Sequence, residues 1–205
     1  MSVDAVVARI AQLNSVLAPQ PATPVSTPQT AAPANATFAS LMGQAASGTA
    51  ATSALPATGG TPAGQAMVNL ARQEVGVAEQ PPGSNDSPRI AQYRQATAGS
   101  GVGPWCAYFT SWAAREAGVP LGDQGQGYGR VDDVWAWAER SGKAMPAATA
   151  QPQPGDLIVW DEHIGIVESV RPDGSVQTIE GNSSDRVSRR VHAKGDAIGY
   201  VRLSN

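Results

Sequence analysis

The sequence predicts an α+β domain in the C-terminal part of the chain, with helices that precede and pack on an antiparallel β-meander. Every Trp and every Tyr lies after Gln80, and both histidines lie after Trp160, so the apolar core belongs to this part. Apolar residues recur at helical spacing up to about residue 140, and after residue 155 the pattern becomes that of strands. Helices followed by a run of strands are typical of the α+β class.

The composition excludes several classes of protein. The chain has 205 residues, of which 41% are hydrophobic and 15% charged, and its net charge of -3 offers no broad basic surface for nucleic acid. The single cysteine, Cys106, excludes an intramolecular disulfide and any zinc site built on several thiolates. No stretch approaches the roughly 20 apolar residues that cross a bilayer, so we expect no membrane insertion.

Two N-terminal segments precede the predicted domain. Residues 1–17 place their apolar side chains on one stripe of a short amphipathic helix, which is either a docking or export segment or a terminal helix of marginal stability. Asp4 stands where a secretory signal would carry positive charge, so no ordinary signal peptide is visible. Residues 18–64 are rich in Ala, Pro and Thr and are expected to be a disordered linker, which leaves residues 65–205 as the domain.

Within the domain, turn residues separate the expected helices and strands. Gly76 and Gly118 stand where the first two helices should end, and Pro104 lies near the first turn of the second. Pro and Gly favour a tight turn at residues 171–174. Helices are expected over residues 67–75, 105–117 and 131–140, a loop over 81–88, and strands over 156–160, 163–170, 175–180, 186–191 and 199–203.

Cys106 lies at the start of the second predicted helix, where a reactive thiol is favoured. Free N–H groups and a partial positive charge at a helix start stabilise a thiolate. A nucleophilic thiol also needs a histidine that accepts its proton and a third side chain that orients the imidazole. His163 opens one strand and Glu180 closes the next, so the hairpin between them brings both to one end of the sheet. Asn182 is a second candidate for orienting the ring or the carboxylate.

Three local sequences carry a resemblance to a known family. PWCAYFTSWAAREAGVP at residues 104–120 resembles the nucleophile helix of CHAP domains, the cysteine, histidine-dependent amidohydrolases and peptidases of the NlpC-type papain-like group. GDLIVWDEHIGIVESV at 155–170 resembles the histidine strand of that family, and IEGNS at 179–183 resembles its acidic segment. The resemblance covers residues 64–203 and implies a papain-like cysteine hydrolase fold.

The resemblance also implies an activity. CHAP domains hydrolyse amide bonds of peptidoglycan, so the expected function is that of an N-acetylmuramoyl-L-alanine amidase or a stem or crossbridge endopeptidase acting through a Cys106 thioester. The backbone N–H of Cys106 is the expected oxyanion donor, and the sequence does not identify a second one. The alternative is a wall-binding or assembly module of the same fold without turnover. Some relatives carry an Asp-rich calcium loop before the nucleophile, but residues 96–105 contain no acid, so we predict no metal and no cofactor.

Other polar and aromatic residues have less specific interpretations. Trp105, Tyr108 and Trp160 are candidates for a substrate-binding groove, although aromatic residues at such spacings are more often part of a core. His192 lies in a basic segment that is typical of an exposed strand, so we expect it to be a bystander. Arg186, Arg189 and Arg190 fit either an anionic wall polymer or a solvated strand face.

The expected substrate also bears on localisation. Peptidoglycan lies outside the cytoplasmic membrane, so we expect an extracytoplasmic protein in the cell wall or periplasm, or a secreted one. Because no signal peptide is visible, a flagellar or phage-type export apparatus that handles residues 1–17 is a candidate partner.

Overall fold

The computed structural model describes residues 59–193 and 195–204. The expected N-terminal helix at 1–17 and most of the expected linker lie outside these residues. In the described part, no helix is long and apolar enough to cross a lipid bilayer. The helices are α3 (Pro62–Glu74), α4 (Pro88–Arg94), α5 (Cys106–Glu116) and α6 (Val131–Arg140), and the strands are β1 (Ala144–Pro146), β2 (Leu157–Val159), β3 (Ile164–Val170), β4 (Val176–Glu180), β5 (Ser188–His192) and β6 (Gly199–Val201).

The strands form one antiparallel sheet in the order β1-β6-β2-β3-β4-β5. The run from β2 to β5 is the predicted meander, in which each strand pairs with the next along the chain. The last strand, β6, instead returns between β1 and β2. The predicted α+β class is therefore confirmed, and the arrangement agrees with a papain-like fold.

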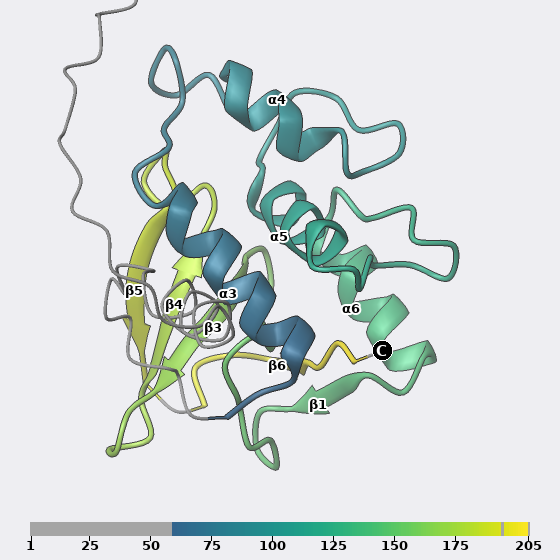
Figure 1. Cartoon of the computed structure of the whole chain (residues 1–205), viewed down its shortest axis with the longest axis vertical. Coiled ribbons are helices and arrows are strands. Elements are labelled where there is room, and N and C mark those ends of the chain that lie inside the picture. The colour runs from purple at the N-terminus through teal and green to yellow at the C-terminus, as the bar shows by residue number, and fades with distance from the viewer. Residues whose placement is uncertain (1–58, 194, 205) are drawn as a thin grey trace, which may run out of the picture. The chain divides into compact units, whose positions relative to one another are not determined.

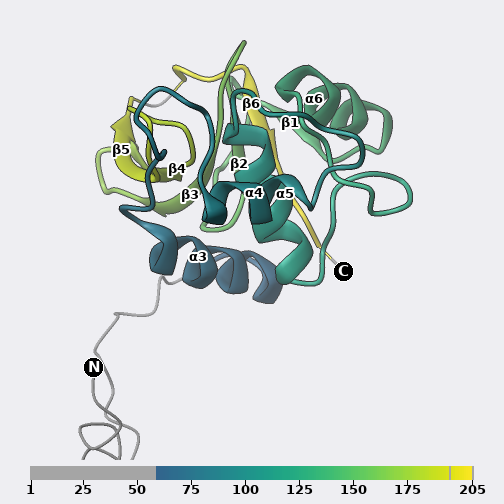
Figure 2. The same ribbon diagram turned by 90° about the horizontal axis from the view of Figure 1, so that it is seen from above.

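The helices α3 and α5 lie against one face of the sheet (Figures 1 and 2). Ile164, Ile166 and Ile179 from β3 and β4 have no exposed surface and belong to the core shared with these helices. Alternate residues of a strand point to opposite faces, and accordingly Val167 and Val176 pack in a second apolar cluster with Tyr200. Both faces of the central strands are therefore buried.

Aromatic side chains join α4 to α5 above the sheet. The ring of Tyr93 lies 5.4 Å from that of Phe109 and 5.0 Å from that of Trp112, measured between centroids. The hydroxyl of Tyr93 donates to Glu74 of α3, which also binds Arg89. These contacts fix α5, the helix that begins with Cys106, between its two neighbours.

Several boundaries differ from those expected. The helix α3 begins at Pro62, because the Thr61 side chain accepts a hydrogen bond from Gly64 N–H and caps it, so ordered structure starts before residue 65. The short elements α4 and β1 were not predicted. By contrast, α6 has the expected bounds, and α5 begins at Cys106 with Trp105 as its N-cap.

The segment that follows α3 lies beside the segment that follows β4. Gly76 N–H donates to Val187 O, and Val187 N–H donates to Val77 O. Ala78 forms an isolated antiparallel bridge with Arg186. This pairing places the loop before α4 next to the end of β4, where the candidate catalytic side chains lie.

Candidate active site

The structure brings Cys106, His163 and Glu180 together from three elements. Cys106 is the first residue of α5, His163 immediately precedes β3, and Glu180 ends β4. The Nε2 atom of His163 lies 2.9 Å from Oε2 of Glu180, which confirms the contact predicted from the hairpin. Since Glu180 occupies Nε2, the nitrogen left for the thiol is Nδ1.

The electrostatic state of His163 reflects both neighbours. Burial disfavours the charged ring, but hydrogen bonds to the Cys106 side chain and to Glu180 outweigh burial and raise the pKa of His163 to about 9. The His163 side chain keeps 31% of its surface exposed. The imidazole is therefore able to hold a proton at neutral pH while it remains next to the thiol.

Glu180 is a buried carboxylate with several donors, and its side chain is only 3% exposed. Burial alone would raise its pKa, but hydrogen bonds from His163, Thr178 and His192 lower the pKa to about 2. A Cβ atom at Gly165, opposite on β3, would lie 2.7 Å from Cγ of Glu180. Glycine at this position therefore leaves the room that the carboxylate occupies.

Asn182 does not share the role of Glu180 in this geometry. Its backbone has a φ of 55°, in the left-handed region that Asn tolerates better than most residues. Within the described residues, its side chain makes no hydrogen bond to His163 or Glu180. Of the two candidates for orienting the imidazole, Glu180 is the one in contact with it.

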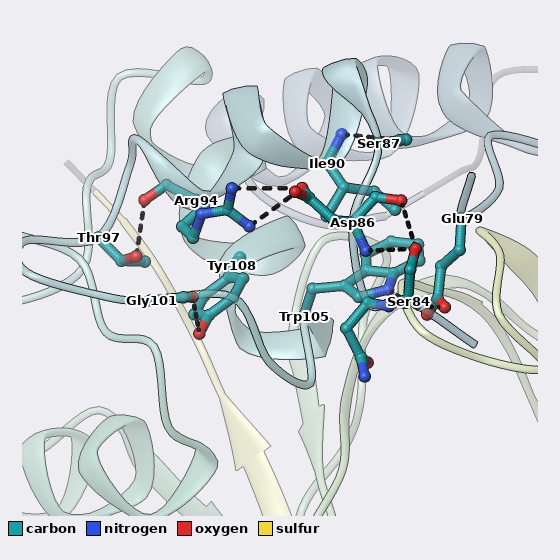
Figure 3. A network of polar contacts seen from close by, with 11 residues as sticks. Glu79, Ser84, Asp86, Ser87, Ile90, Arg94, Thr97, Gly101, Trp105 and Tyr108 are labelled. Atoms are coloured by element: carbon teal, nitrogen blue, oxygen red, sulfur yellow. Dashed lines mark hydrogen bonds and ion pairs between the residues drawn. The ribbon is translucent and has the colours of Figure 1, made fainter. Parts of the chain in front are cut away.

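A polar network fixes the start of α5 from two sides (Figure 3). On one side, the indole N–H of Trp105 donates to Glu79 Oε1 at 2.9 Å, and Glu79 Oε2 accepts from Asn85 N–H. On the other side, the Tyr108 hydroxyl donates to Gly101 O at 3.0 Å. Glu79 is itself buried, so the hydrogen bond between Trp105 and Glu79 has little access to water.

The three aromatic candidates for substrate binding have different surroundings. Trp105 has 0% of its surface exposed and its indole N–H is already bonded to Glu79, so it packs in the core and does not offer a face to substrate. Tyr108 is also largely buried, but it lines the cleft beside Cys106. Trp160 is half-buried, with its ring 5.7 Å from that of His163.

An open cleft of about 430 Å³ gives access to Cys106. A second hollow of about 440 Å³ continues from it and shares Tyr108, Gly129 and Arg130. The first cleft has more acidic than basic side chains. It is lined by Pro104, Cys106, Tyr108, Gly129, Arg130, Val131, Asp132, Asp161 and Glu162.

No metal centre is found in the described ranges, 59–193 and 195–204, where no three His, Cys, Asp or Glu side chains are grouped to hold an ion. Asp86, in the loop before α4, is paired with Arg94. Asp123 accepts a hydrogen bond from the Trp137 indole. The side chains that the structure brings together at the site are a thiol, an imidazole and a carboxylate.

Two residues in contact with the site residues were not predicted from the sequence. Glu79 lies far from Cys106 along the chain. Its one local signal in the sequence is its position just before the loop at residues 81–88. His192 was expected to be a bystander, but its Nε2 atom lies 2.6 Å from Oε1 of Glu180. The strand is exposed, as expected, but the His192 side chain points toward Glu180 and not into solvent.

Comparison with known protein families gives a match over the part of the chain that contains these side chains. The family model of the CHAP domain matches residues 97–182, a range that includes Cys106, His163 and Glu180. No curated protein and no solved structure gives a significant match to the chain.

Proposed function

Since the chain carries a CHAP domain, whose members are hydrolases that act on peptidoglycan, we propose that it cleaves an amide bond of peptidoglycan with Cys106 as nucleophile. The observation that carries the proposal is the position of His163, which contacts Glu180 through Nε2 and interacts with the Cys106 side chain. The carboxylate holds the imidazole in the orientation that a base for the thiol requires.

The proposed reaction is an acyl transfer through a thioester. His163, whose raised pKa lets it hold the thiol proton at neutral pH, keeps this proton while Sγ of Cys106 attacks the carbonyl carbon, and then donates it to the nitrogen of the leaving amine as the C–N bond breaks. Water then attacks the thioester carbonyl carbon while His163 accepts one of its protons, and the C–S bond breaks, so that this proton is again shared by His163 and Sγ of Cys106. The free carboxylate product leaves, and the thiol is restored. Throughout, Glu180 stays ionised and stabilises the imidazolium.

The start of α5 supports the charge that develops on the substrate oxygen. Trp105, the N-cap residue, makes no side-chain cap hydrogen bond, so the first N–H groups of the helix are not capped from there. In the described residues, no backbone acceptor is found for the N–H of Cys106. This N–H is the proposed oxyanion donor.

The shape of the cleft supports an extended substrate. The hollow at Cys106 continues past Tyr108 and Gly129 into the second hollow. A Cβ atom at Gly129 would lie 2.3 Å from Ser100 Oγ and 2.7 Å from Tyr108 Cε1, so this wall of the cleft is closely packed. We propose that peptide or sugar flanking the scissile amide lies along these two hollows.

Mass spectrometry of digested sacculi tests the proposal and assigns the bond. The full chain incubated with purified peptidoglycan is expected to release soluble fragments. A new amino terminus on L-Ala would identify a muramoyl amidase, and a terminus inside the stem or crossbridge would identify an endopeptidase. A sample without protein is the control. Binding to sacculi with no new terminus would contradict the proposal and favour the wall-binding alternative.

Action on peptidoglycan also implies an extracytoplasmic location. We propose export through residues 1–17, which lie outside the described residues, by a flagellar or phage-type apparatus. Secretion of the full chain, compared with a chain that lacks residues 1–17, tests this route: equal secretion would contradict it.

A further inference from the structure

His192 is the last residue of β5, and its side chain contacts the oxygen of Glu180 that His163 does not contact. Its Nε2 atom lies 2.6 Å from Oε1 of Glu180, while His163 Nε2 lies 2.9 Å from Oε2. The hydroxyl of Thr178 also donates to Oε1. Both oxygens of the carboxylate therefore have partners, and the two imidazoles contact different ones.

The path of the Glu180 side chain explains why the strand register does not reveal this contact. Glu180 pairs across the sheet with Ser188, and His192 pairs with Val176 at the other end of β4. The Glu180 side chain extends back along β4 over Thr178, to which it is hydrogen bonded, and so comes within reach of His192.

Trp160 packs against both histidines. Its ring centroid lies 4.5 Å from that of His192 and 5.7 Å from that of His163. The His192 side chain is 25% exposed, so this packing and the hydrogen bond to Glu180 cover most of it. His192 is therefore held in place on an edge strand whose central residues are exposed.

A carboxylate that orients an imidazole must itself be kept from turning. If Oε2 alone were anchored, the buried group would have free torsions and an unsatisfied oxygen, which is costly away from water. The donors on Oε1 remove both problems. One is the Thr178 hydroxyl on the same strand, and the other is His192 on the neighbouring strand.

We propose that His192 is a positioning residue of the catalytic centre, which holds Oε1 of Glu180 so that Oε2 stays on Nε2 of His163. This inference rests on the proposed cysteine mechanism and adds a fourth side chain to it. Cys106 on α5 faces His163, and His163 and His192 face opposite oxygens of Glu180 on β4. His192 does not contact the thiol and acts only through Glu180.

Two variants separate the hydrogen bond of His192 from its ring packing. In His192→Phe an aromatic ring remains against Trp160 but the donor is lost. In His192→Gln the amide nitrogen replaces Nε2 as donor but the ring is lost. Val191→Thr is the matched control, because Val191 is an exposed neighbour on the same strand that has no contact with Glu180.

The rate of alkylation of Cys106 by iodoacetamide is the first readout, because the chain contains one cysteine. At about pH 6 a thiol reacts quickly only if an imidazolium stabilises its thiolate. We expect His192→Phe to slow this reaction about tenfold or more, the effect of losing one hydrogen bond to a charged group. At about pH 10, where an ordinary thiol is ionised, the rates of all variants should agree.

Peptidoglycan hydrolysis is the second readout. His192→Phe is expected to lower kcat about tenfold with KM within about twofold, since a positioning residue acts on the reaction and not on binding. His192→Gln should stay within about threefold of the parent protein in both readouts. Unfolding midpoints of all three variants identify any general loss of structure.

The proposal is overturned if Cys106 of His192→Phe is alkylated at the parent rate at about pH 6. It is also overturned if alkylation and hydrolysis are slowed as much in His192→Gln as in His192→Phe. A loss of rate at both pH values would indicate damaged structure and also contradicts the positioning role. If the parent protein alkylates as expected but does not cleave peptidoglycan, the proposed function fails, and the role of His192 in orienting Glu180 is still decided by alkylation.

Discussion

Cys106→Ala is expected to reduce peptidoglycan hydrolysis by about 10⁴-fold or more, because removing a nucleophile eliminates the covalent route and leaves only binding and oxyanion stabilisation. Cys106 is 4% exposed and its side chain is small, so removing the thiol changes packing little. The rate of release of new amino termini from sacculi measures the effect.

Cys106→Ser is the companion variant. It keeps the size and the proton of the side chain but replaces the thiol with a much weaker nucleophile, so it should be nearly as inactive as Cys106→Ala. Both variants should bind sacculi as the parent protein does. Substantial cleavage by either one would contradict the assignment of Cys106.

Glu180→Gln is expected to lower kcat about 10²-fold and to change the pH dependence, because it removes the charge that stabilises the His163 imidazolium. The hydrogen bonds of Cys106 and Glu180 raise the pKa of His163 from its ordinary value of 6.5 to about 9. The parent activity should therefore fall as the pH rises through about 9, where His163 loses the proton that the leaving amine needs. In the variant this alkaline limb should move toward 6.5.

Glu168→Gln is a matched control for a buried acid that lies outside the catalytic contacts. Glu168 is 4% exposed and bonds Arg72, Arg189 and Gln177, and hydrogen bonds from these side chains outweigh burial and lower its pKa to about 2. Loss of the Glu168 carboxylate is expected to lower the unfolding midpoint, while the fall of activity at alkaline pH stays at the same pH. An unchanged limb in Glu180→Gln would contradict the role given to Glu180.

Local sequence signals predicted the central elements of the fold well. The apolar spacing over residues 131–140 predicted the bounds of α6. Pro104 marked the start of α5 and Gly118 marked its end. The hairpin through residues 171–174 correctly placed His163 beside Glu180. These features depend on neighbours in the sequence, which is why the sequence alone reveals them.

Features that depend on distant residues were not visible. The three-residue strand β1 ends in a Pro at the edge of the sheet, and it exists because β6 pairs with it. Trp105 was a candidate for substrate binding because it adjoins Cys106, yet its indole N–H donates to the buried Glu79. The helix α4, although not predicted, does have a local signal in the sequence, because Ser87 caps it and Pro88 follows.

His192 is the most informative miss. Its exposed, basic neighbours predict a solvated strand, and the register of β5 pairs it with Val176. Only the direction of the Glu180 side chain, back along its own strand, brings the two groups together. Sequence periodicity fixes the face of a strand on which a residue lies, but not how far a long side chain extends along that face.

The extent of Cys106 alkylation, measured against activity, tests the central claim most directly. The chain contains one cysteine, so the mass of the intact protein after partial reaction with iodoacetamide gives the fraction of Cys106 that is modified. The cysteine mechanism predicts that peptidoglycan hydrolysis falls in proportion to this fraction and disappears when every molecule carries one adduct. Cleavage by fully alkylated protein would contradict it.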